Sequence, residues 1–211
     1  MRVVRTGWRF ALPLLLLSPP FTMFSPPLGL GMFVIGIAVL LFFRDPARYP
    51  PPGGIVSPAD GRISVIREED DRLRIGVFMN VTDVHVNRAP LPGRITDLTH
   101  RPGAHRPAFS KDSDRNERVD FRIDGTELTI DVSLIAGAFA RRISPYVSVD
   151  DSVERGERIG HIAFGSRADV LLPPVIEREA LAINRGDRVR AGETPLVDPK
   201  IHGHNRSASD R

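Results

Sequence analysis

The stretch Val119-Asp-Phe-Arg-Ile-Asp-Gly-Thr-Glu-Leu-Thr-Ile-Asp-Val132 decides the fold class of this chain. Apolar residues alternate with polar residues on both sides of Asp124-Gly125. Such alternation places the apolar side chains on one face of a strand, and an Asp-Gly pair between two such runs is a strong local signal for a β-hairpin. We therefore predict two antiparallel strands joined by a turn at Asp124-Gly125.

Further short apolar alternations, separated by turn residues, extend this pattern along the chain. They predict strands over residues 62–66, 73–78, 159–164 and 168–172. No stretch beyond residue 50 has apolar residues at a period of 3.6 over three turns, which an amphipathic helix packed on a core would need. We therefore expect a mainly β domain over residues 49–200, after the stiff proline-rich linker that begins at Tyr49.

Two six-residue segments resemble each other: ERGERI at 154–159 and NRGDRV at 184–189. The glycine of each segment suits a turn, and the aliphatic residue at its end suits the start of a strand. This pattern resembles the strand-turn of biotinyl and lipoyl domains. The resemblance implies a compact barrel-sandwich-like β core, and it also raises a carrier or binding module as an alternative function.

The composition limits the chemistry that the chain can perform. A carrier of the biotinyl or lipoyl type needs a lysine at the exposed turn, but the only lysines are Lys111 and Lys200, far from both glycine turns. The absence of cysteine excludes disulfides, thiolate zinc sites and cysteine nucleophiles. The net charge of +3 favours anionic surfaces such as phospholipid headgroups. Binding of nucleic acid is not predicted, because aromatic residues do not alternate with the basic ones.

The N-terminal region has a different character, since residues 10–43 contain no charged residue. The run LGLGMFVIGIAVLLFF at 28–43 would be apolar on all sides of a helix, which suits lipid better than a protein core. Prolines at 13, 19, 20, 26 and 27 are expected to divide the region. A signal peptide is the alternative, but no small-x-small cleavage site precedes Arg44. We therefore predict a membrane-associating segment with apolar helical structure over residues 1–48.

Arginines flank the apolar region on both sides: Arg2, Arg5 and Arg9 precede it, and Arg44 and Arg48 follow it. Basic flanks at both ends suit a hairpin or re-entrant segment with both ends in the cytoplasm, while a single span and peripheral attachment stay open as alternatives. We therefore expect the chain at the cell (inner) membrane, with its β domain on the cytoplasmic side. At the other end of the chain, residues 201–211 form a polar tail.

The pair Gly165-Ser166 lies between two of the predicted strands. A serine hydroxyl that follows glycine can attack the preceding carbonyl, because glycine leaves that carbonyl uncrowded and tolerates the strained backbone that the attack requires. The resulting N-to-O acyl shift forms an ester, and elimination and hydrolysis then leave a pyruvoyl group at a new N-terminus. Such a group would provide the electrophilic carbonyl for which this lysine-poor chain offers few other candidates.

Four motifs in order make the chain similar to the short form of the phosphatidylserine decarboxylase proenzymes. They are SPADG at 57–61, DVHVNRAP at 83–90, NER at 116–118 and FGS at 164–166. The resemblance covers residues 44–198 and implies a pyruvoyl-dependent carboxy-lyase that cleaves itself between Gly165 and Ser166. The products would be a β chain (residues 1–165) and an α chain (residues 166–211) that stay together as a heterodimer. It leaves any higher oligomer open.

The same resemblance implies a substrate, a cofactor and helper residues. The pyruvoyl group derived from Ser166 would form a Schiff base with phosphatidylserine, accept the electrons released with carbon dioxide and yield phosphatidylethanolamine. Neither pyridoxal phosphate nor a metal is expected. Asp60 and His85 are expected to assist Ser166 in self-cleavage. Long members have a second histidine three residues after the first, and this chain has Arg88 there. Either His85 takes both duties, or the short form divides them differently.

A zinc endopeptidase on a related β fold is the alternative from another class. His202 and His204 would be one pair of its ligands. Such a site also needs an upstream histidine with an aspartate four residues later, and no histidine of this chain has one. We therefore predict no metal site.

Overall fold

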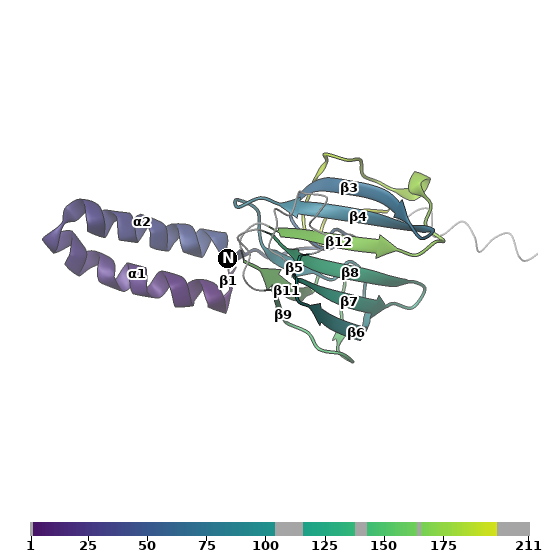
Figure 1. Ribbon diagram of the computed structural model, residues 1–211, viewed down its shortest axis with the longest axis horizontal. Helices are drawn as coiled ribbons and strands as arrows, with labels where there is room; N and C mark the ends of the chain where they lie inside the picture. The colour runs from purple at the N-terminus through teal and green to yellow at the C-terminus, as the bar shows by residue number, and fades with distance from the viewer. Residues whose placement is uncertain (1, 104–115, 138–142, 164–165, 198–211) are drawn as a thin grey trace, which may run out of the picture. The chain divides into compact units, whose positions relative to one another are not determined.

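The computed structural model describes residues 2–103, 116–137, 143–163 and 166–197. The chain divides into two compact units. The first unit contains residues 1–47 and 82–85, and the second contains residues 48–81 and the chain from residue 86 onward. The first unit is largely helical and the second largely β (Figure 1).

The first unit is a helical hairpin closed by a short ribbon. The helices α1 (Arg5–Phe24) and α2 (Pro26–Phe42) pack against each other and are joined at Ser25. The strand β1 (Arg2–Val3) pairs antiparallel with β2 (Arg44–Asp45), so the two ends of the hairpin lie together. No helix in the described part of the chain has both the length and the apolar character of a membrane-spanning helix.

The helix α1 continues through three prolines that were expected to divide it, Pro13, Pro19 and Pro20. Pro19 cannot donate the usual hydrogen bond to the Leu15 carbonyl, four residues earlier. The Ser18 hydroxyl donates to that carbonyl instead, at 3.0 Å, and satisfies it. The chain reverses only at Ser25, after which α2 begins with proline, in a position where a missing N–H costs nothing.

The second unit is built on an eight-stranded antiparallel sheet that curls across Figure 1. In sheet order its strands are β10 (Ser152–Val153), β6 (Gly93–Arg101), β7 (Arg118–Asp124), β8 (Thr129–Ala136), β12 (Ser166–Leu172), β4 (Arg72–Met79), β3 (Gly61–Glu69) and β13 (Arg188–Val189). All neighbours are antiparallel. The prediction of a mainly β fold is confirmed.

A smaller sheet packs over β7 and β8. In order, its strands are β5 (Val86–Arg88), β11 (Arg158–Ile162) and β9 (Ile143–Pro145). Ile159 and Ile162 of this sheet belong to the same buried apolar cluster as Phe121 and Leu134 of the large sheet. The core therefore lies between the two sheets. A 3-10 helix (Arg178–Ala180) follows β12.

The strands β7 and β8 form the hairpin that the sequence predicted, with Asp124 opposite Thr129. Its loop spans residues 125–128 and is closed by a hydrogen bond from the Gly125 N–H to the Leu128 carbonyl, at 3.0 Å. A Cβ at position 125 would lie 2.7 Å from Leu91 Cδ1. A side chain at this position would therefore displace Leu91 and crowd the Pro92 carbonyl, which would lie 3.0 Å from the Cβ.

The two similar segments form turns of one design. The Glu157 N–H donates to the Glu154 carbonyl at 3.0 Å, and the Asp187 N–H donates to the Asn184 carbonyl at 3.2 Å. In both turns the acidic side chain accepts the backbone N–H of the first residue at 2.7 Å. The glycine between them has a φ of 78° in the first turn and 95° in the second, which glycine adopts without strain.

Candidate active site

Ser166 is the first residue of β12 and is fully buried. It lies opposite Met79 of β4 and Ala136 of β8. Its hydroxyl donates to Met79 Sδ at 3.8 Å. Because a thioether is a weak acceptor, no strong hydrogen bond holds this hydroxyl within the described residues. Gly165, the other residue of the predicted cleavage site, lies outside the described residues.

The strand β12 lies inside the sheet and pairs with β4 on one side and with β8 on the other. Ala168, Val170 and Leu172 alternate toward the apolar core. Arg167 and Asp169 point to the opposite face but are also buried, with 4% and 1% of their surfaces exposed. Ser166, the residue after the predicted cleavage point, is therefore the first residue of a strand that is hydrogen-bonded to a neighbour on each side.

A buried ion network holds β12 immediately after Ser166. Asp169 accepts from Arg167 Nε at 2.7 Å and from Arg167 Nη2 at 2.9 Å. It also accepts from Arg74 Nη1 of β4 at 3.0 Å, and Arg74 in turn binds both carboxylate oxygens of Glu69. Gly76 lies opposite Asp169, where a Cβ would come within 2.9 Å of Asp169 Oδ1. The glycine thus makes room for the carboxylate.

This network shifts the ionisation of its members. The hydrogen bond from Arg74 lowers the pKa of Glu69 below its usual value. Burial by itself lowers the pKa of Arg74, but its hydrogen bond with Glu69 and the charge of Asp169 raise that pKa above its usual value. Both groups are therefore charged at neutral pH, and the network is ionic.

Asp60, which was predicted to assist self-cleavage, binds groups from distant parts of the chain. Arg48 Nη2 donates to both of its carboxylate oxygens, at 2.9 and 2.7 Å, and the Ala191 N–H donates to Oδ1 at 2.8 Å. Arg48 also pairs with Glu193 at 3.1 Å. Within the described residues, no hydrogen bond joins Asp60 to Ser166. The helper role of Asp60 stays a prediction.

His85, the second predicted helper, belongs to the first unit. Its ring lies against the ring of Phe42, with 4.3 Å between centroids, and its Nδ1 is 3.0 Å from the Asp83 carbonyl. Arg88, at the place of the second histidine of long members, is buried and donates to the Gly156 carbonyl at 2.8 Å. Arg88 therefore supports a turn. The role of His85 stays a prediction.

Two residues that the sequence analysis did not single out lie close to the Ser166 hydroxyl. Met79 contacts it directly, and Asn87 Nδ2 donates to the same sulfur at 3.7 Å. Asn87 is fully buried in β5. Asn87 could have been noticed from the sequence, because it is a polar residue inside the DVHVNRAP motif. Met79 could not, because only the pairing of β4 with β12 brings it to Ser166.

His161 of β11 is a further buried residue that can titrate. Its Nδ1 lies 2.9 Å from the Tyr146 hydroxyl. Burial lowers the pKa of His161, so the ring is neutral at pH 7. His202 and His204, the ligand pair of the endopeptidase alternative, lie outside the described residues, as do Lys111 and Lys200.

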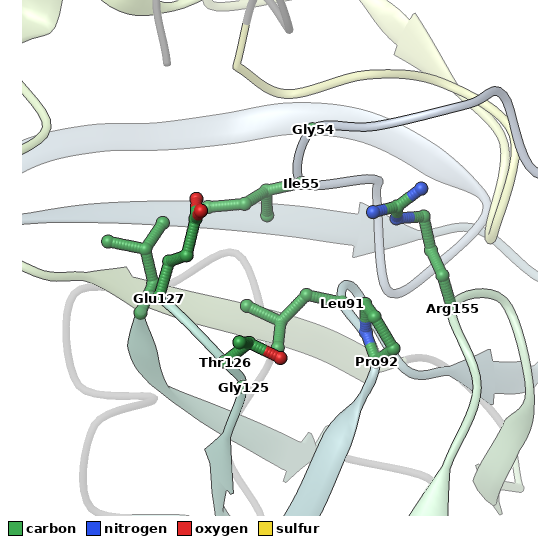
Figure 2. A pocket seen from close by; sticks show the side chains of 9 residues that line it. Gly54, Ile55, Leu91, Pro92, Gly125, Thr126, Glu127 and Arg155 are labelled. Atoms are coloured by element: carbon green, nitrogen blue, oxygen red, sulfur yellow. The ribbon is translucent and has the colours of Figure 1, made fainter. Parts of the chain in front are cut away.

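A pocket of about 180 Å³ opens at the turn of the β7–β8 hairpin (Figure 2). Gly125 and Leu128 line it from the hairpin, and the side chains of Glu127 and Arg155 lie on two sides of it. Ser166 pairs with the opposite end of β8, at Ala136. This pocket is therefore distinct from the surroundings of Ser166.

The model of the family "Phosphatidylserine decarboxylase" matches residues 35–197, which include all four motifs. The chain belongs to the phosphatidylserine decarboxylase family. It is 53% identical over 191 residues to a protein of Halobacterium salinarum provisionally named archaetidylserine decarboxylase proenzyme, covering 90% of this chain and 95% of that protein. It is 51% identical over 170 residues to the phosphatidylserine decarboxylase proenzyme of Thermobifida fusca, covering 80% and 77%.

Membership of the phosphatidylserine decarboxylase family confirms the principal prediction from the motifs. The chain is a decarboxylase, and both relatives are named as proenzymes. Neither the carrier nor the zinc endopeptidase alternative finds support in these comparisons. The short motifs therefore identified the family although each of them alone is common.

Proposed function

We propose that the chain cleaves itself between Gly165 and Ser166 and then decarboxylates phosphatidylserine to phosphatidylethanolamine. The observation that carries this proposal is the position of Ser166 in a chain of this family. Ser166 is buried and begins β12, and among the described residues its hydroxyl contacts only a weak acceptor. The names of the relatives share a serine headgroup and differ in the lipid. The serine headgroup is therefore the part of the proposed substrate that both names support.

In the self-cleavage step, Ser166 Oγ attacks the carbonyl carbon of Gly165. The bond from Oγ to that carbon forms, the peptide C–N bond breaks, and the hydroxyl proton ends on the Ser166 nitrogen. Elimination then releases the β chain as a carboxylate, and hydrolysis releases ammonia and leaves a pyruvoyl group on the α chain. We propose Asp60 and His85 as helpers in this step, as the family resemblance implies.

The surroundings of Ser166 fit a pyruvoyl group. In that group a methyl replaces the hydroxymethyl of serine, and the Met79 thioether can contact either of them favourably. Burial at this position excludes bulk water from the carbonyl. When formed, the group supplies an electrophilic carbonyl that takes up the substrate amine and accepts the electron pair released with carbon dioxide.

The pairing of the strands supports a stable heterodimer of the two chains. The α chain contributes β12, which pairs with β4 and β8 of the β chain. The α chain also pairs with the SPADG region, where Ser57 donates its N–H to the Thr194 carbonyl and accepts the Gly192 N–H, both at 2.8 Å. These contacts and the shared core do not depend on the Gly165–Ser166 peptide bond.

Intact mass of the purified protein tests the proposal. We expect two pieces of roughly 18 and 5 kDa, by residue proportion of the 23.3 kDa chain, that separate only in denaturant. The small piece should resist Edman sequencing, because its first residue has a ketone in place of an amine. A fully active protein that runs as one unbroken chain would refute self-cleavage at this bond.

We also propose that the helical hairpin attaches the enzyme to the cytoplasmic face of the cell membrane. Large apolar side chains are exposed along both helices, among them Phe10, Leu16, Met23, Leu30 and Val34. In water this surface would carry a large hydrophobic penalty, which lipid removes. The pairing of β1 with β2 brings the basic ends of the hairpin to one side, which suits the positive cytoplasmic flank.

Removal of residues 1–43 is expected to shift the protein from the membrane fraction to the supernatant while self-cleavage continues. The reason is that the deletion takes away the exposed apolar helices and leaves all strands of the second unit. Sedimentation of cell lysates followed by immunoblotting measures both results. The full chain is the control, and a truncated protein that still sediments entirely with membranes would refute the attachment.

The finer fold assignment is also a proposal. We infer that the two packed sheets form a barrel-sandwich-like core related to biotinyl and lipoyl domains. Support comes from the two glycine turns, which have the same hydrogen bonds and each precede a strand.

A further inference from the structure

The side chain of Asn87 contains a buried oxygen that has no hydrogen-bond partner among the residues that the structure describes. Asn87 is fully buried in β5, and its Oδ1 meets no donor in the described part of the chain. An unpaired buried acceptor lowers stability, and a leucine of similar shape would avoid this cost. Such an exception in a native structure calls for an explanation, and a catalytic role is one of the common ones.

The position of Asn87 suggests what this oxygen is for. Its Nδ2 donates to Met79 Sδ at 3.7 Å, and the Ser166 hydroxyl donates to the same sulfur at 3.8 Å. Both side chains thus meet at one atom, which is a weak acceptor for each of them. Exchanging a contact to sulfur for one to an amide oxygen would strengthen the hydrogen bond of the hydroxyl.

We propose that Asn87 is a positioning residue for self-cleavage, whose Oδ1 accepts the Ser166 hydroxyl and directs an Oγ lone pair toward the Gly165 carbonyl. This inference rests on the proposed self-cleavage. The amide is neutral and takes no proton. It fixes the orientation of the hydroxyl, while the proton still passes from Oγ to the Ser166 nitrogen as the C–N bond breaks.

The test measures the rate of self-cleavage in a cell-free translation of the full chain. All four methionines lie in the β chain, so a pulse of labelled methionine followed by a chase shows the uncleaved chain and its product on a denaturing gel. Asn87→Leu should slow cleavage about tenfold or more, because the hydroxyl loses its orienting acceptor. Its thermal unfolding temperature should be no lower than that of the wild type, because the variant no longer buries an unpaired oxygen.

Two further variants separate positioning from packing. Met79→Leu conserves the volume beside Ser166 and removes the sulfur. It should slow cleavage less than Asn87→Leu does, since the sulfur is not the productive acceptor. Asn87→Asp keeps an oxygen at the same place and should cleave faster than Asn87→Leu. Its rate should rise with pH as the new carboxyl ionises, beyond whatever pH dependence the proposed helpers Asp60 and His85 give the wild type measured in parallel.

The outcomes distinguish this inference from the proposal on which it depends. A wild-type chain that is never cleaved would refute the proposed self-cleavage itself. A wild-type chain that is cleaved, together with an Asn87→Leu variant cleaved at the same rate, would overturn only the role of Asn87. The role is also overturned if both Asn87 variants lose cleavage and thermal stability in parallel, because a structural role alone would produce that result.

Discussion

Ser166→Ala is expected to leave the protein as one uncleaved chain of 211 residues without decarboxylase activity. Alanine has no hydroxyl to attack the Gly165 carbonyl, so neither the ester nor the electrophilic carbonyl can form. The fold should persist, because the change removes only one oxygen, whose contact within the described residues is a weak one to Met79 at 3.8 Å. We expect the free energy of unfolding to change by less than about 1 kcal/mol.

Intact mass and release of carbon dioxide from phosphatidylserine vesicles measure the two losses. Ser64→Ala is a matched control, since Ser64 is also a strand serine with a hydrogen bond to a neighbouring strand, at 3.2 Å to the Gly76 carbonyl. This control should be cleaved and active like the wild type. Cleavage at residue 165 in the Ser166→Ala variant would show that another group supplies the nucleophile.

Local patterns accounted for the elements of the fold that could be predicted. The hairpin at Asp124 is specified by alternation and turn residues within 14 residues, and it occurs where the sequence placed it. The strand boundaries differ from the predicted ones by up to four residues, because strand ends depend on the partner strands. The prediction that prolines would divide α1 was wrong. At Pro19 the Ser18 hydroxyl donates the hydrogen bond that the proline cannot, and residue propensities do not predict such a contact.

Residues of the candidate site could be predicted only where they belong to a sequence motif. Gly165-Ser166 was found because the chemistry needs that pair of residues. The surroundings of Ser166 were not, because Met79 is 87 residues away and is brought to it by pairing of β4 with β12. In the same way, a motif marked Asp60, but only the fold reveals its ion pair with Arg48.

Asp169→Asn is expected to destabilise the chain by about 3–5 kcal/mol, the usual loss when one partner of a buried ion pair is removed. The Asp169 side chain is 1% exposed and lies between the guanidinium groups of Arg167 and Arg74. Asparagine has one acceptor oxygen for the three donor contacts, and its own N–H groups would face donors. Of the two carboxylates that pair with Arg74 in the described structure, Glu69 and Asp169, Glu69 would then be left to balance its charge.

The measurement is best made in the Ser166→Ala background, where the uncleaved chain unfolds without dissociation and urea denaturation reports one free energy. Arg94→Ala is the matched control, because its ion pair with Asp150 has side chains 60% and 70% exposed and should contribute less than about 1 kcal/mol. Equal losses in the two variants would contradict a stabilising buried network. After the proposed self-cleavage, Asp169 would belong to the α chain and Arg74 to the β chain, so Asp169→Asn should also lower the urea concentration at which the chains separate. The residue that anchors β12 in the fold would thus hold the α chain, and with it the new N-terminus at residue 166, in place after the peptide bond is cut.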